Sequence, residues 1–148
     1  MTGQRTAYSL AELIIVVLIV GVLAFVAVPR LNFAALYHKQ AHTVAKKIVT
    51  DLRRTRTLAI VNAAKNQASF TLSISGLNYQ ITDDFNGATV DSQAIPEQVH
   101  CNGGPDFTFG PLGNLTSSGT QLEVFADEDR KYIITITSAT GMVGCTGG

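Results

Sequence analysis

The chain has 148 residues and a mass of 15.8 kDa, which fits one domain of ordinary size and excludes a multidomain enzyme. Apolar residues make up 46% and charged residues only 15%, below the roughly 25% of an average soluble domain, so a disordered chain is excluded. The net charge is zero, but residues 30–65 carry eight basic and one acidic residue, and residues 66–148 carry two basic and nine acidic residues. This segregation indicates a binding or assembly surface.

The apolar residues concentrate near the start of the chain. Residues 13–28 run for sixteen positions without a polar side chain, and extension to Leu10 gives nineteen positions interrupted only by Glu12. Nineteen helical residues span about 29 Å, close to the ~30 Å of a bilayer core, so we expect a transmembrane helix. Three interpretations are open: a cleaved secretory signal, a plain membrane anchor, or a segment that begins in a membrane and ends inside a protein assembly.

Glu12 bears on this choice. A secretory signal needs a small-x-small cleavage site, which residues 22–24 could supply. A secretory signal has a basic region before its apolar stretch, whereas the carboxylate here is negatively charged. An unpaired carboxylate next to the apolar stretch also costs several kcal/mol. The alternative is a glutamate at the level of the lipid headgroups, where the helix dipole stabilises it by about 0.3–1 kcal/mol.

Residues 8–13 (YSLAEL) and the apolar run after them resemble the prepilin-type cleavage and methylation segment of type IV pilins and type II secretion pseudopilins. The resemblance implies cleavage between Ala7 and Tyr8 by a prepilin peptidase, with N-methylation of Tyr8. It also implies roles in assembly for Glu12, Gly21 and Pro29. In the family this carboxylate is thought to pair with the free N-terminal amine of a neighbouring subunit, while the glycine and proline weaken the helix where a filament bends.

Membrane orientation does not follow from charge, because Arg5 precedes the span and Arg30 and Lys39 follow it. The resemblance implies a single-pass protein of the bacterial inner membrane, with its N-terminus cytoplasmic and its C-terminal domain periplasmic. It then passes into a filament or pseudopilus. The implied organisation is a leader (1–7), a hydrophobic transmembrane and filament-core helix (8–29), an amphipathic helix (30–65) and a β domain (66–148).

The amphipathic helix has two distinct faces. One face repeats with a 3.6-residue period, and Asn62 lies at its edge; it contains Ala41, Val44, Ala45, Ile48, Leu52, Thr55, Ala59 and Ala63. The other face is basic and contains Lys39, Lys46, Lys47, Arg53 and Arg54. No proline lies between Pro29 and Pro96, so we expect one long, bent or straight helix from about residue 9 to residue 64.

Beyond Asn66, alternating apolar residues and turn signals predict short strands. The candidate strands are residues 70–74, 79–81, 88–90, 98–101, 107–109, 120–125 and 132–137. The predicted fold class is therefore α+β, with a long N-terminal helix packed on a C-terminal antiparallel β domain, as in pilins. Residues 52–60, 107–113, 121–125 and 133–143 also resemble the H-type minor pseudopilins and T-type minor pilins.

Cys101 and Cys145 are the only cysteines. In an oxidising periplasm they are expected to form a disulfide, closing a loop of about 45 residues and contributing on the order of 3–4 kcal/mol. The alternative is two free, buried thiols.

His38 and His42 have a spacing that suits a metal, but no nearby acid or cysteine completes a ligand set, so we expect no metal site and a solvent-facing pair. His100 has no better support. The chain contains no G-x-S-x-G, H-E-x-x-H or P-loop pattern, so neither an enzyme nor a cofactor is expected.

The sequence thus predicts a minor pilin or pseudopilin, assembled with other pilins or pseudopilins. One alternative is a DNA-binding minor pilin for DNA uptake. Some T-type relatives are thought to use arginines in the C-terminal tail, but residues 141–144 contain none, which leaves Lys46, Lys47, Arg53 and Arg54 as possible subunit or DNA contacts. A further alternative is a soluble protein secreted after cleavage at Ala24. We also expect the acidic residues 127–129 to face the basic helix of an adjacent subunit.

Overall fold

The computed structural model describes residues 9–27, 33–66, 69–104 and 106–148. The chain divides into two units, the first ending at Phe33 and the second spanning Ala34–Gly148. The first unit contains helix α1 (Leu10–Ala27). Helix α1 begins where the backbone N–H groups of Glu12 and Leu13 donate hydrogen bonds to the Ser9 carbonyl. Among the described residues, no helix combines the length and the hydropathy that crossing a membrane requires.

The second unit is built on helix α2 (Phe33–Asn66), which has 34 residues and is about 51 Å long. Of its predicted apolar face, Ala41, Ala45, Ile48, Leu52, Thr55 and Ala59 are fully buried, while Val44 and Ala63 are half-buried. Val49 and Asp51 are buried as well, although the sequence pattern did not predict it. The expectation of one helix from residue 9 to residue 64 passes through residues 28–32, which lie outside the described ranges.

The described strands form two antiparallel sheets, ordered β3-β2-β1-β5 and β4-β6-β7-β8. The first sheet contains β1 (Phe70–Ser75), β2 (Asn78–Asp83), β3 (Ala88–Ala94) and β5 (Asp106–Phe109). The second contains β4 (His100–Gly103), β6 (Gln121–Asp127), β7 (Arg130–Ile136) and β8 (Val143–Gly147). Strands β1 to β7 match the seven predicted segments, with shifted ends, whereas β8 was not predicted. Each sheet therefore has two edge strands, and β8 is one of them.

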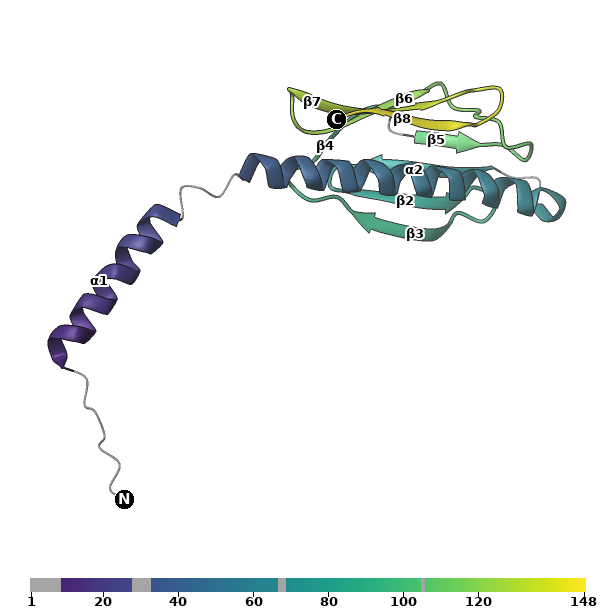
Figure 1. The fold of residues 1–148 in the computed structure, drawn as a ribbon. Coiled ribbons are helices and arrows are strands. Elements are labelled where there is room, and N and C mark those ends of the chain that lie inside the picture. The colour runs from purple at the N-terminus through teal and green to yellow at the C-terminus, as the bar shows by residue number, and fades with distance from the viewer. Residues whose placement is uncertain (1–8, 28–32, 67–68, 105) are drawn as a thin grey trace, which may run out of the picture. The chain divides into compact units, whose positions relative to one another are not determined.

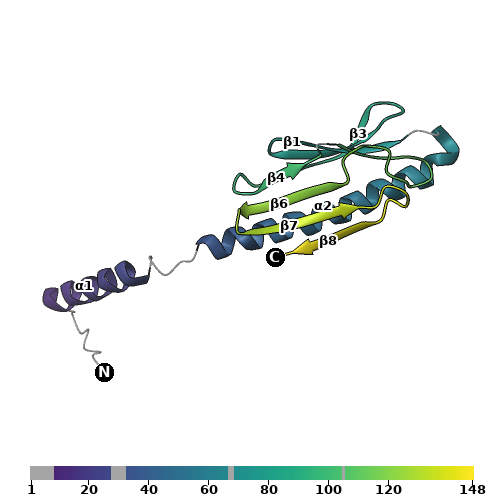
Figure 2. The ribbon, with the colours of Figure 1, turned by 90° about the horizontal axis from the view of Figure 1, so that it is seen from above.

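The core lies where α2 meets both sheets. Figure 1 shows α2 running along the sheets, with β2 and β3 on one side and β7 and β8 on the other. In Figure 2, seen from above, β7 lies over α2. Phe107, Phe109, Leu72, Leu122 and Ile134 have 2% or less of their surface exposed. Each such side chain contributes about 1.5–3 kcal/mol when fully buried. The predicted α+β fold, with a long helix packed on antiparallel strands, is confirmed.

Candidate assembly surface

Apart from Glu12, helix α1 presents an apolar surface along its described side chains. Leu13 and Val17 are 61% and 62% exposed, and Phe25 is 82% exposed. Glu12 lies in the first turn of α1, where a carboxylate is favoured by the helix dipole. A Cβ atom added at Gly21 would have no neighbour within 4 Å, so this position is open on the helix surface. An apolar surface of this kind requires a lipid or protein partner.

The other predicted residues of this segment lie outside the described residues. They are Ala7, Tyr8 and Pro29. Cleavage, N-methylation and bending at these positions therefore stay predictions.

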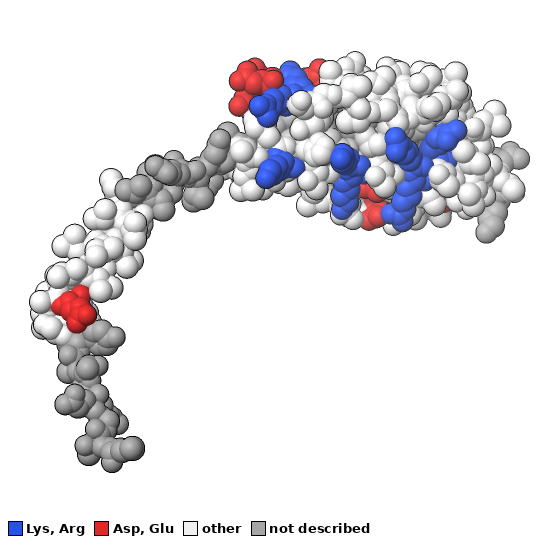
Figure 3. All heavy atoms as spheres, in the orientation of Figure 1, with Lys and Arg blue, Asp and Glu red and all other residues white. Residues whose placement is uncertain are grey.

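The basic face of α2 is exposed, as predicted. We call Lys39, Lys46, Lys47, Arg53 and Arg54 the basic surface of α2; all five side chains are exposed. Figure 3 shows lysine and arginine side chains spaced along the domain over α2. Their exposure fits a surface that meets either solvent or a neighbouring molecule.

Three members of this surface are bound to the chain's own β strands. Lys47 Nζ donates to Gln93 Oε1 (2.5 Å) in β3, and Arg53 Nη2 donates to the Val143 carbonyl (3.0 Å) in β8. Arg54 Nη1 forms an ion pair of 2.5 Å with Asp91 Oδ2. Hydrogen bonds from Gln93 and Arg54 lower the pKa of the Asp91 carboxyl. The side chains of Lys39 and Lys46 form no hydrogen bond or ion pair with the described residues. Contact of Lys46, Lys47, Arg53 and Arg54 with a subunit or with DNA stays a prediction.

Arg56 fastens α2 to two loops of the β domain. Its Nε donates to the carbonyls of Gly113 (3.1 Å) and Thr140 (3.0 Å). Gly141, beside Thr140, has a positive φ of 64°, and a Cβ there would lie 2.0 Å from the Gly113 carbonyl oxygen. Arg56 lies in a stretch that resembles the minor pseudopilins, but the sequence predicts no role for it, because its acceptors are more than 55 residues away.

A buried polar pair joins α2 to β2. The Tyr79 hydroxyl donates to Asp51 Oδ2 (2.5 Å), and these residues are 3% and 8% exposed. Burial and the hydrogen bond to Asp51 raise the pKa of Tyr79 well above its ordinary value. The one available signal was that Asp51 is the sole acid within residues 30–65.

The acidic turn, residues 127–129, connects β6 to β7, and its three side chains are exposed. Beside it, Lys131 Nζ lies 3.4 Å from Glu123 Oε2 and 5.0 Å from the centre of the Phe125 ring. The expected contact between this turn and a neighbouring subunit stays a prediction.

The predicted disulfide is wrong. Cys101 and Cys145 are free thiols, the first half-buried and the second exposed. Cys101 lies on β4 and Cys145 on β8, the opposite edges of one sheet, with β6 and β7 between them. Three strand spacings separate them by about 14 Å, whereas a disulfide requires Cα atoms within about 7 Å. Burial raises the pKa of the Cys101 thiol to about 11 and also raises that of Cys145, against the opposing effect of nearby Lys46.

The histidines lie in different surroundings. His42 is exposed as predicted, with its ring centre 5.2 Å from that of Tyr132. His38 is half-buried instead of solvent-facing, and its Nδ1 atom is buried without a hydrogen-bond partner. His100 lies on β4, with its ring centre 5.8 Å from that of Phe125. Within the described ranges, no three His, Cys, Asp or Glu side chains gather closely enough to hold a metal ion.

No protein-family model and no curated protein matches the chain. Solved structures do match it. The type IV minor pilin FimU of Pseudomonas aeruginosa, in two crystal forms, aligns with TM-scores of 0.59 and 0.61 at 12% identity, covering 71% and 73% of this chain and 91% and 89% of FimU. The minor pseudopilin EpsH from the type 2 secretion system of Vibrio cholerae aligns with a TM-score of 0.59 at 12% identity, covering 73% of this chain and 97% of EpsH. The likeness shows that this chain has the fold of pilins and pseudopilins.

Proposed function

We propose that this chain is a minor pilin or pseudopilin, a structural subunit of a type II secretion pseudopilus or a type IV pilus. The observation that carries the proposal is the combination of an exposed apolar helix with a β domain of the fold seen in FimU and EpsH. The spacing of Tyr8, Glu12, Gly21 and Pro29 supports it independently of the fold. In this function the apolar helix supplies the filament core and the β domain faces outward.

The subunit is made as a precursor held in the bacterial inner membrane by residues 8–29, with its N-terminus cytoplasmic and its β domain periplasmic. Prepilin peptidase removes residues 1–7 and the new N-terminus at Tyr8 is methylated. Cleavage leaves a free amine four residues before Glu12. Since an unpaired carboxylate is costly in an apolar environment, Glu12 pairs with the amine of a neighbouring subunit and sets the register of the helices.

Processing is the first prediction. In a host that carries the peptidase, intact-mass measurement and N-terminal sequencing should give a chain that begins at Tyr8. A chain that begins at Phe25 would overturn the proposal in favour of a cleaved secretory signal. Glu12→Ala should leave cleavage largely intact but reduce incorporation into filaments, because the charge pair forms only between subunits; normal incorporation of this variant would contradict the pairing.

The structure gives the DNA-uptake alternative no added support. Of the four residues that could have contacted nucleic acid phosphates, Lys47, Arg53 and Arg54 are bound to the chain's own Gln93, Val143 and Asp91. We therefore retain the structural role in a filament as the proposal.

A further inference from the structure

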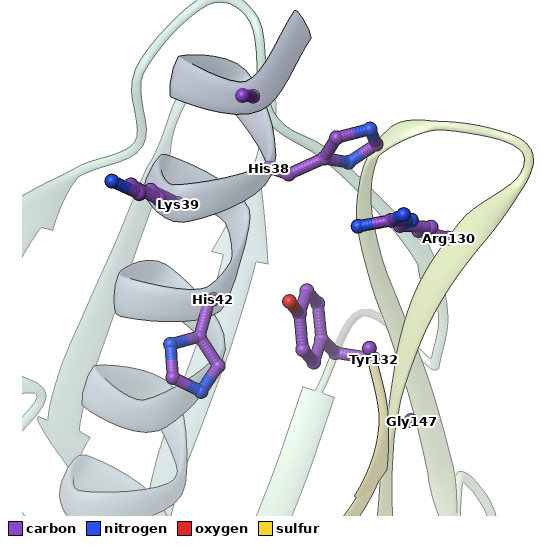
Figure 4. Close-up of a pocket in the computed structure, with 8 residues that line it drawn as sticks. His38, Lys39, His42, Arg130, Tyr132 and Gly147 are labelled. Carbon is purple, nitrogen blue, oxygen red and sulfur yellow. The ribbon is translucent and has the colours of Figure 1, made fainter.

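A cavity of about 470 Å³, open to solvent, lies between the first turns of α2 and strands β7 and β8. Five of its lining side chains carry nitrogen or hydroxyl groups that donate hydrogen bonds, namely His38, Lys39, His42, Arg130 and Tyr132. Figure 4 shows Arg130 directed from the β7 strand toward His38 on α2, with the Tyr132 hydroxyl pointing toward the helix below them. Gly147 and Gly148 line the cavity without side chains. The cavity is thus bordered by donors and by bare backbone.

The polar groups of this cavity lack partners within the described chain. The Nδ1 atom of His38 is buried and has no hydrogen-bond partner, whereas the residue as a whole is half-buried and lines the cavity. Arg130 forms no ion pair with any described carboxylate, and the Tyr132 hydroxyl forms no hydrogen bond with a described residue. No acidic side chain lines the cavity, although the acidic turn immediately precedes Arg130. An oxygen-rich ligand would satisfy several of these groups together.

Charge and geometry decide which class of ligand suits the cavity. The Arg130 guanidinium disfavours a metal cation at the two histidines, since like charges repel. An anion is favoured, and donors that reach it from three residues on two elements suit the several oxygens of a phosphate better than the two oxygens of a carboxylate. The volume falls in the range of about 300–1,000 Å³ that holds small organic ligands and exceeds the needs of a bare ion.

We propose that this cavity binds a phosphate ester with a small organic group, with Arg130, His38 and Tyr132 holding the phosphate oxygens. A soluble phosphate ester and the headgroup of an anionic phospholipid share this chemistry. The inference does not depend on the filament function proposed above.

The first experiment uses the full-length chain in an uncharged detergent, titrated calorimetrically with glycerol 3-phosphate. Saturable binding is expected, and Arg130→Gln and His38→Phe should each weaken it about tenfold, since each removes one donor to the phosphate, and in Arg130→Gln a charged one. Lys46→Gln is the matched control, because it removes an equal charge from an exposed position on α2 outside the cavity; it should leave binding unchanged. Lack of saturable binding, or equal weakening by Lys46→Gln and Arg130→Gln, would overturn the site unless the bilayer experiment below detects a headgroup.

The second experiment distinguishes the two sources of the phosphate. The full-length chain is placed in bilayer nanodiscs of phosphatidylcholine, with or without phosphatidylglycerol, and the ring signals of His38 are followed by NMR. A shift with phosphatidylglycerol that disappears in Arg130→Gln assigns the site to a lipid headgroup. A shift only after addition of glycerol 3-phosphate assigns it to a soluble ester. Unchanged His38 signals under both conditions would overturn the proposal.

Discussion

Asp51 shows how a single residue couples the helix to a sheet. Its carboxylate lies on the buried face of α2 and accepts the hydrogen bond of Tyr79. Because both groups are cut off from solvent, the pair is costly to break from one side only. On the exposed face of α2 the same carboxylate would be hydrated and would need no partner within the protein.

The second prediction concerns this hydrogen bond. Tyr79→Phe should lower the free energy of unfolding by about 1–3 kcal/mol, because it leaves the Asp51 carboxylate buried without its donor. Urea unfolding of the two chains measures the difference. Tyr132→Phe is the matched control, since the Tyr132 hydroxyl has no hydrogen bond to a described residue, and its effect should stay within about 0.5 kcal/mol. Equal effects of the two substitutions would contradict the assigned role of the Asp51–Tyr79 pair.

The third prediction follows from the raised pKa of Tyr79. The folded protein keeps the phenol protonated at a pH where the unfolded chain, with an ordinary tyrosine pKa near ~10, has released the proton. The contribution of the protonated Tyr79 to the free energy of unfolding is therefore fully present below pH ~10. It is lost as the pH rises above this value, by at most about 1.4 kcal/mol per pH unit. Unfolding free energies measured between pH ~9 and ~12 should fall more steeply for the native chain than for Tyr79→Phe. Parallel curves would contradict this.

At the scale of single elements, the turn between β7 and β8 depends on backbone that only glycine supplies easily. Gly141 has a positive φ of 64°, and its N–H donates to the Thr137 carbonyl at 2.7 Å. The close Gly113 carbonyl leaves no room for a side chain. This turn directs the chain into β8 and places the Thr140 carbonyl where Arg56 binds it.

The fourth prediction compares two glycines. Gly141→Ala should destabilise the fold by more than about 2 kcal/mol, because it adds a steric clash with the Gly113 carbonyl to the strain of a positive φ. Gly76→Ala, at a φ of 58° with nothing within 4 Å of the added Cβ, tests that strain alone. It should cost about 1–2 kcal/mol. Thermal or urea unfolding of both variants provides the comparison, and an equal loss would show that the close carbonyl moves aside freely.

Sequence pattern predicted most of the elements, because burial follows periodicity. The 3.6-residue pattern of α2 and the alternation in β1 and β7 identify the faces that are buried in the structure. Strand β8 was missed because its sequence VGCTG has two glycines and no alternation, and its pairing with β7 alone defines it. Asp51 was missed because its partner is 28 residues away. The predicted disulfide was wrong because an oxidising compartment favours pairing in general. The order of the strands places these two cysteines on opposite edges of one sheet, too far apart to pair.

At the scale of the whole molecule, charge segregation is partly resolved within the chain. Basic residues of α2 meet Asp91 and backbone carbonyls of the acidic β domain, so part of the separated charge serves the fold itself. The side chains of Lys46 and of the acidic turn form no such contact within the described residues, and we propose them for contacts between molecules. Exposed ion pairs between molecules contribute about 0–1 kcal/mol each, so they influence the choice of partner more than the affinity of association.

The fifth prediction tests that surface. Lys46→Glu should weaken association of the full-length chain with its partner pilins or pseudopilins by no more than about fivefold, without altering the free energy of unfolding. Arg54→Glu is the contrasting variant, because it breaks the internal pair with Asp91 and should also lower stability. Association measured at several salt concentrations should weaken as salt rises. Association that is insensitive to salt, or unaffected by Lys46→Glu, would contradict the charge-matching model.

The attachment of α2 to both sheets has a mechanical consequence. Asp51, Arg53 and Arg54 lie within one helical turn, and they contact β2, β8 and β3 respectively. A force applied along the axis of α2 would load these links side by side, in shear, instead of peeling one strand at a time. The helix would therefore transmit tension to both sheets at the same time. Under such a force the β domain would unfold as one unit.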